Sequence, residues 1–290
     1  MRFNRLVIYI LIFIPFAGYA SIVKVLGEQS KEDKSHFYFL DLIELTLSKS
    51  SSQFPAKSMT VINVKNTTHG RSLKLLEKGY VDVFWAGTNI DREQRFIPIR
   101  MPLFLGLLGY RVSIIHKDNL EKFKQLVTTP DLLKKFTACQ GQHWPDSDIL
   151  EENGFKVARI ARFDLMFKML NVKRCDYFPR AIFEGYSELA TAREQYPDLM
   201  MFDEVILHYP FPLYFFIHKN NQALADQIEF GLQQAIMDGS LMAMMKSHTL
   251  SKDLFPLSKW KKRVYLHLMN NDLPTQTPLN NGKYWLKLYQ

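Results

Sequence analysis

The sequence of 290 residues has only two cysteines, and it lacks the short motifs that mark common catalytic and metal-binding sites. No CxxC or HxxxH spacing occurs, so a zinc site is not expected. GxSxG, HExxH, GxGxxG and P-loop motifs are also missing, which argues against the enzyme classes that carry them. We therefore expect no metal, no cofactor and no enzymatic activity.

Long apolar runs are equally scarce, and the one that stands out lies at the N-terminus. Residues 6–16 are mostly apolar, follow Arg2 and Arg5, and precede the small residues Gly18 and Ala20. This order is typical of a secretory signal peptide cleaved after Ala20. The run is short for a membrane span of about 20 residues, although an uncleaved anchor is the alternative. We expect an exported, periplasmic protein.

Charge of one sign is only mildly in excess. The net charge is +8, and loss of Arg2 and Arg5 with the signal peptide would leave 35 basic and 29 acidic residues, or +6. The one dense basic run, residues 259–263, is interpreted as a solvated surface. Export argues against a nucleic-acid partner, and the mild excess is compatible with an anionic ligand.

The two cysteines, Cys139 and Cys175, lie 36 positions apart inside predicted buried strands. An oxidising compartment permits a disulfide between them. Small buried thiols are the alternative, because free cysteine is among the most buried residue types. The sequence leaves both open.

Short β patterns alternate with helical ones along the chain. In the first part, the pattern predicts strands at 21–28, 59–65 and 80–86, and helices at 36–49 and 70–78. In the second part, it predicts strands at 110–116, 136–140, 155–160 and 175–178, and helices at 119–127, 130–135, 146–153, 163–172 and 182–195. An extended stretch at 199–218 and a long helix at 221–248 follow. Strand–helix–strand repeats indicate parallel sheets with right-handed crossovers.

The expected architecture is therefore α/β with two lobes, the second inserted in the first. After the signal peptide (1–20), lobe 1 is expected to comprise residues 21–111 and 208–290, and lobe 2 residues 112–207. The irregular segment 250–290 is expected to pack against lobe 1. Two crossings, near 110–116 and 203–208, would form a two-strand hinge, and ligands commonly bind in clefts between domains.

Three segments resemble motifs of one known family. They are LLEKGYVDV at 75–83, AGTN at 86–89 followed by Arg92 and MPL at 101–103, and RCDYF at 174–178. Together they resemble the extracellular solute-binding proteins of family 3, which have the type II periplasmic-binding-protein fold and include polar amino acid receptors of ABC transporters. The likeness spans nearly the whole chain after residue 20.

The resemblance implies roles for several residues. Arg92 matches the arginine that holds a ligand carboxylate, next to the loop that contains Thr88, and Arg95 is its rival. A guanidinium suits that role because its planar fork pairs with both carboxylate oxygens. The family's amine-binding aspartate is replaced here by Ala181, beside Arg180.

Other candidate residues of the site follow from the same resemblance and from their positions in the predicted elements. Arg100 stands near a position where the family has serine, so Arg92, Arg100 and Arg180 favour an anionic solute, with Glu184 as a candidate replacement for the missing aspartate. Four aromatic residues are candidate ligand contacts: Trp85, Trp144, Tyr177 and Tyr38. For Trp144 and Tyr38, ordinary packing is the alternative. The loop at 141–147 enters a helix whose N-terminus could bind an anion, although Asp146 or Ser147 could simply cap it.

The function that the resemblance implies is capture of a small, anionic or amino-acid-like solute by lobe closure. A monomer would then present the closed form to a membrane permease of an ABC transporter or to a membrane sensor. Two alternatives remain, because fold does not fix function. One is ligand sensing through a separate signalling partner, and the other is a lyase- or dehydratase-like enzyme on the same fold.

Overall fold

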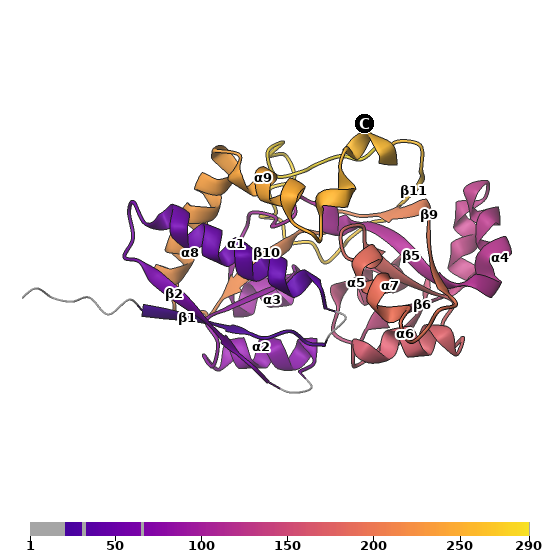
Figure 1. The fold of residues 1–290 in the computed structure, drawn as a ribbon, viewed down its shortest axis with the longest axis horizontal. Helices are drawn as coiled ribbons and strands as arrows, with labels where there is room; N and C mark the ends of the chain where they lie inside the picture. Colours follow the sequence, from indigo (N-terminus) through magenta and orange to yellow (C-terminus); the bar gives the residue numbers. More distant parts are fainter. Residues whose placement is uncertain (1–20, 31–32, 65–66, 290) are drawn as a thin grey trace, which may run out of the picture.

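The computed structural model describes residues 21–30, 33–64 and 67–289. The predicted signal peptide lies outside these residues. Within them, no helix has both the length and the apolar composition needed to cross a bilayer. The described chain forms two α/β lobes side by side, each built around its own sheet (Figure 1).

The first lobe contains a five-stranded sheet in the order β2-β1-β3-β10-β4. Its strands are β1 (Ser21–Leu26), β2 (Lys57–Ile62), β3 (Val83–Gly87), β4 (Ile97–Ile99) and β10 (Leu213–Ile217). Its helices are α1 (Ser35–Ser50), α2 (His69–Glu77), α3 (Ile90–Arg95), α8 (Gln222–Met237) and α9 (Ser240–Ser247). Strands β1, β2 and β3 run parallel, and β10 is antiparallel to β3 and β4. The predicted parallel strand–helix–strand start is confirmed.

The second lobe contains a six-stranded sheet in the order β11-β9-β5-β8-β6-β7. Its strands are β5 (Tyr110–His116), β6 (Thr137–Gly141), β7 (Lys156–Ile160), β8 (Tyr177–Ala181), β9 (Leu199–His208) and β11 (Val264–His267). Its helices are α4 (Leu120–Lys124), α5 (Pro145–Glu152), α6 (Asp164–Asn171) and α7 (Gly185–Ala192). All seven residues of β5 are buried, as expected for a central strand between helical layers.

Three predicted helices differ from the structure. The helix expected at 119–127 is a short α4 between two 3₁₀ turns, and residues 130–135 form a 3₁₀ helix. The long helix expected at 221–248 is divided into α8 and α9 at Gly239, whose φ of +80° lies in the left-handed region that favours glycine.

The two lobes are joined where β5 begins and where β9 ends. These segments contact each other directly, since the Tyr209 amide donates to the Gly109 carbonyl at 3.1 Å. A side chain at position 109 would collide with the carbonyl of Tyr209, so the close approach requires glycine.

The C-terminal tail, residues 250–289, differs from the expectation that it packs against the first lobe alone. Its strand β11 pairs in parallel with β9 of the second lobe, and it then returns to the first lobe, where the Leu286 amide donates to Leu105 at 2.8 Å (Figure 1). The physical reason is the open edge of β9, whose backbone groups find partners in the short β-prone segment VYLH. The tail therefore spans both lobes.

Candidate functional site

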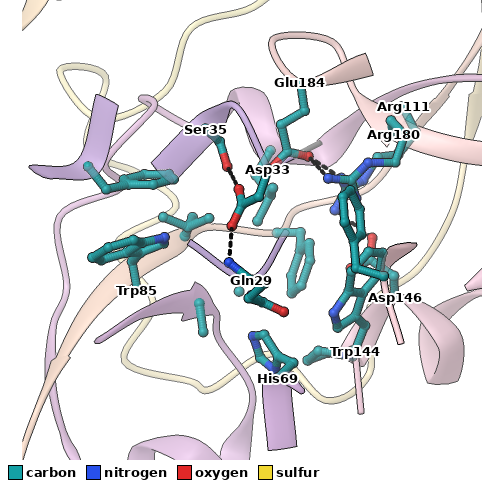
Figure 2. A pocket seen from close by; sticks show the side chains of 18 of the residues that line it. Gln29, Asp33, Ser35, His69, Trp85, Arg111, Trp144, Asp146, Arg180 and Glu184 are labelled. Atoms are coloured by element: carbon teal, nitrogen blue, oxygen red, sulfur yellow. Dashed lines mark hydrogen bonds and ion pairs between the residues drawn. The ribbon is translucent and has the colours of Figure 1, made fainter. Parts of the chain in front are cut away.

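A cavity of about 100 Å³ lies between the lobes and is lined from both (Figure 2). The first lobe contributes residues from the β1–α1 connection, α1, α2, β3 and α3, and the second lobe contributes residues from β5, the β6–α5 loop, β8 and α7. The charged lining residues are Asp33, Arg92, Arg111, Asp146, Arg180, Glu184 and Glu188. Three guanidinium groups thus face four carboxyl groups.

The charges from the second lobe pair with one another. Arg111 lies 2.5 Å from Asp146 and 3.8 Å from Glu184. Arg180 lies 2.8 Å from Glu184 and 2.6 Å from Glu188. Each of these five side chains is less than a tenth exposed. Buried charges of this kind persist only when they are paired and hydrogen-bonded, so the network supports itself.

Local sequence places this network where it is. Arg180 stands in β8, and Glu184 and Glu188 follow at intervals of four residues as the chain enters α7. Asp146 occupies the first turn of α5, where a carboxylate is favoured by the helix dipole. The Tyr209 hydroxyl donates to Asp146 and accepts from Arg111 Nε at 3.1 Å. Burial raises the pKa of Glu188 to about 7, even though Arg180 acts to lower it.

Arg92 is buried and has no carboxylate in hydrogen-bond contact among the described residues. One of its Nη groups donates to the Gly87 carbonyl, and the other donates to the His143 carbonyl of the second lobe at 2.7 Å. Its guanidinium has five N–H donors, and a third contact joins Nη2 to His69 Nδ1 at 3.5 Å, so two donors remain for another partner. Burial lowers the pKa of Arg92 to about 10, and the group stays charged at neutral pH.

Asp33 is the other charged residue that the first lobe contributes to the cavity lining, and its charge is opposite to that of Arg92. Its carboxylate accepts from the Ser35 hydroxyl at 2.9 Å and from the backbone N–H of Gln29 at 3.5 Å (Figure 2). Within the described part of the chain, no cation lies within ion-pair distance of it. Burial raises its pKa, and the opposing effects of these hydrogen bonds and of the more distant Arg180 charge are smaller.

Aromatic rings form two walls of the cavity. Trp85 stacks on Phe39 with ring centres 5.1 Å apart on the first-lobe side. Trp144 lies on the second-lobe side, with the Arg180 guanidinium 4.9 Å from its ring centre. His69 also lines the cavity, and burial holds its pKa well below the usual value, so this ring is neutral. The walls offer flat apolar surfaces beside the charges.

Four of the eight predicted ligand residues line this cavity: Arg92, Trp85, Trp144 and Arg180. The argument for an anionic solute changes, however, because Arg180 is already paired with two glutamates and Arg100 is not among the lining residues. Glu184, the candidate replacement for the missing aspartate, does line the cavity. The rival Arg95 lies outside, paired with Glu77 and Asp91.

The other four predicted ligand residues lie away from the cavity. Thr88 donates to Glu93 at 2.7 Å, and Arg100 binds the other oxygen of Glu93 at 2.8 Å, so these two hold α3 in place. Tyr38 lies inside α1, stacked on a phenylalanine in the core. Tyr177 is buried in β8 within the core of the second lobe. For Tyr38, the core-packing alternative fits its position, and the prediction that Tyr177 contacts a ligand does not.

Sequence reasoning missed Asp33, Arg111 and Glu188 as lining residues. For Arg111 a signal was present, because an arginine in the otherwise apolar strand YRVSIIH must find a buried partner. Asp33 gave no such signal, since an aspartate shortly before a helix is commonly only a cap.

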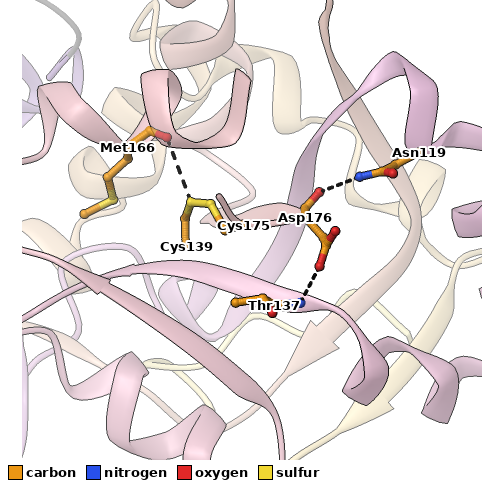
Figure 3. The surroundings of a disulfide bond; sticks show 6 residues. All are labelled: Asn119, Thr137, Cys139, Met166, Cys175 and Asp176. Carbon is orange, nitrogen blue, oxygen red and sulfur yellow. Dashed lines mark hydrogen bonds between the residues drawn. A yellow bond between two sulfur atoms is a disulfide. The ribbon is translucent and has the colours of Figure 1, made fainter. Parts of the chain in front are cut away.

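A disulfide joins the two cysteines and braces the second-lobe side of the cavity (Figure 3). The Cα atoms of Cys139 and Cys175 are 5.5 Å apart, and both side chains are almost completely buried. Cys139 lies in β6, which leads to Trp144, and Cys175 lies two residues before β8, which carries Arg180. The bond thus ties together the two strands that deliver this half of the lining.

Comparison with known proteins supports the fold. No family model and no curated protein matches the sequence. Among solved structures, the chain is similar to an ancestral arginine-binding protein bound to glutamine, with 15% identity and a TM-score of 0.56 over 80% of this chain and 99% of that protein. A structure described for glutathione import via GshT and the cystine ABC importer TcyBC of Streptococcus mutans shares 11% identity, with a TM-score of 0.56 over 79% and 95%.

A third similar structure is a histidine kinase sensor domain with similarity to periplasmic binding proteins. It shares 14% identity with this chain, with a TM-score of 0.52 over 78% of this chain and 93% of that one. The chain therefore has the two-lobed α/β fold of periplasmic binding proteins. At these identities the likeness establishes the fold and leaves the ligand to the site itself.

Proposed function

We propose that the protein is an exported solute-binding protein that holds a small solute with both a positive and a negative group between its lobes. The observation that carries the proposal is the set of charges left over in the cavity. The second-lobe charges pair with one another, whereas Arg92 and Asp33 of the first lobe have no ion pair with any residue that the structure describes. A dipolar, amino-acid-like solute would supply a carboxylate for Arg92 and a cation for Asp33.

Closure of the lobes on the solute follows from the same geometry. Arg92 of the first lobe already contacts the His143 carbonyl of the second, and the aromatic walls come from opposite lobes. A solute bound by both lobes stabilises the closed form, which a membrane permease or a separate sensor could then read. The proposal includes processing after Ala20, release to the periplasm, and lobe boundaries near residues 111 and 208.

The Asp33→Asn variant tests the charge assignment. We expect it to weaken binding of the cognate solute by about 1.5–3 kcal/mol, or roughly 10- to 150-fold, because the charged hydrogen bond is lost. A thermal-shift screen of neutral amino acids, dicarboxylates and diamines would first identify solutes that bind. Isothermal titration calorimetry would then measure their affinities. Only solutes of mixed charge should raise the melting temperature.

The control is Asp41→Asn, which removes an exposed carboxylate from α1. Its affinity should match that of the unmodified protein. In the unmodified protein, affinity for the solute should fall as the pH drops through the raised pKa of Asp33, because only the ionised carboxylate attracts a cation. Asp33→Asn should reduce this pH dependence, and the part that remains belongs to Glu188 of the same cavity, whose pKa burial raises to about 7. Equal binding by all three proteins would exclude Asp33 from the site. Chemical conversion of the bound solute, followed by mass spectrometry, would favour an enzyme instead.

A further inference from the structure

Two histidines face each other at the hinge, far from any predicted site residue in the sequence. His208 ends β9, His267 ends β11, and the two are direct partners in the parallel strand pair. Their Nδ1 atoms are 3.0 Å apart, and their rings are nearly perpendicular at 86°. His267 is exposed and His208 is half-buried, so solvent reaches the pair.

This distance fits a hydrogen bond between the two rings, and it also fits two ligands of a single metal ion. Two nitrogens bound at about 2.0–2.1 Å from a metal, at an angle between a right angle and the tetrahedral angle, lie roughly 2.9–3.4 Å apart. The Nδ1 separation of 3.0 Å lies in that interval. Imidazole nitrogens without carboxylates favour late first-row divalent cations over Ca²⁺ and Mg²⁺.

We propose that His208 and His267 form a binding site for a late first-row divalent cation such as Cu²⁺ or Zn²⁺. The described residues contain no group of three or more histidine, cysteine or acidic side chains placed to hold a metal. The protein therefore supplies two ligands, and water completes the coordination. The rings of Tyr110, Tyr265 and Tyr289 surround the pair and fix its orientation.

The position of the site gives it a consequence for the hinge. His208 lies at the second crossing between the lobes and pairs with Tyr110 at the first. His267 belongs to the tail, which continues through Asn270, whose side chain donates to the Pro210 carbonyl at 2.9 Å. A metal shared by the two imidazoles would fasten the tail to both crossings. This inference does not depend on the solute cavity.

Copper titration of the mature, chelator-treated protein tests the site. We expect one Cu²⁺ to bind per chain, with electron paramagnetic resonance showing hyperfine coupling to two imidazole nitrogens. The His208→Ala and His267→Ala variants should each bind at least about tenfold more weakly. The matched control is His218→Ala, which removes a histidine that directly follows β10. This variant should bind Cu²⁺ as tightly as the unmodified protein does.

A spectrum of the unmodified protein without coupling from two imidazoles would overturn the proposal, and this measurement does not depend on how the variants fold. Unchanged affinity in both the His208→Ala and His267→Ala variants would also overturn it. In either case the pair would be an imidazole–imidazole hydrogen bond only. Zn²⁺ should raise the melting temperature of the unmodified protein and leave that of His267→Ala unchanged.

Discussion

Replacing Arg180 with methionine is expected to lower the free energy of unfolding by about 3–5 kcal/mol. Arg180 is buried between Glu184 and Glu188. Its removal leaves Glu188 away from water without its cation and leaves Glu184 with only the 3.8 Å contact to Arg111. Methionine keeps an apolar side chain of similar length but removes the guanidinium that lies 4.9 Å from the Trp144 ring centre, so the loss combines the ion pairs with this smaller contact. Urea denaturation at pH 7 measures it.

The pH dependence of the same variant separates charge from packing. Without Arg180, the pKa of Glu188, which burial already raises, rises further in the folded state, so the folded form binds protons more tightly than the unfolded chain. The deficit in stability is therefore small below the ordinary carboxyl pKa and grows as the pH rises. Arg162→Met is the control, because its pair with Asp164 is exposed and contributes at most about 1 kcal/mol. A deficit that is the same at pH 4 and pH 8 would contradict this account.

The second large effect is expected from the disulfide. In the chain-entropy model, a bond that closes a loop of 36 residues stabilises the folded protein by about 4 kcal/mol. The Cys139→Ala/Cys175→Ala variant should lose about 3–4 kcal/mol in urea denaturation. The unmodified protein should lose a similar amount when its unfolding is measured under reducing conditions.

The place of the bond adds a second readout to this experiment. Because it ties β6 to the start of β8, its loss should loosen the positions of Trp144 and Arg180 as well as lower stability. Solute affinity should therefore fall in the double alanine variant even at temperatures where it is folded. Full stability of that variant would show that the two cysteines act as separate buried residues.

The sequence predicts the elements of this fold better than it predicts how they meet. Alternation of short apolar runs with amphipathic segments is local, and it identified most strands of both sheets. The tail was misplaced because β11 has only four residues and depends on the open edge of β9, which is remote in the sequence. Pairing between distant edges leaves no periodic signal.

The site shows the same limit for charges. The resemblance of the motifs predicted Arg92 as a ligand residue, and Arg92 lines the cavity. Arg180, which stands next to the position of the missing aspartate, lines it as well. Whether a charge is free, however, depends on neighbours in three dimensions: Arg180 is paired, whereas Asp33 has no ion-pair partner in the described part of the chain. The inference of an anionic solute rested on counting arginines, and the carboxylates around them change the conclusion to a solute of mixed charge.

Native mass spectrometry of the mature protein, isolated from the periplasm of its own cells, tests the central claim most directly. The account predicts one small solute of mixed charge bound to each chain, chemically unchanged on release, and retained by Asp41→Asn but lost from Asp33→Asn. An empty protein in every preparation, a solute of a single charge sign, or equal retention by both variants would contradict it.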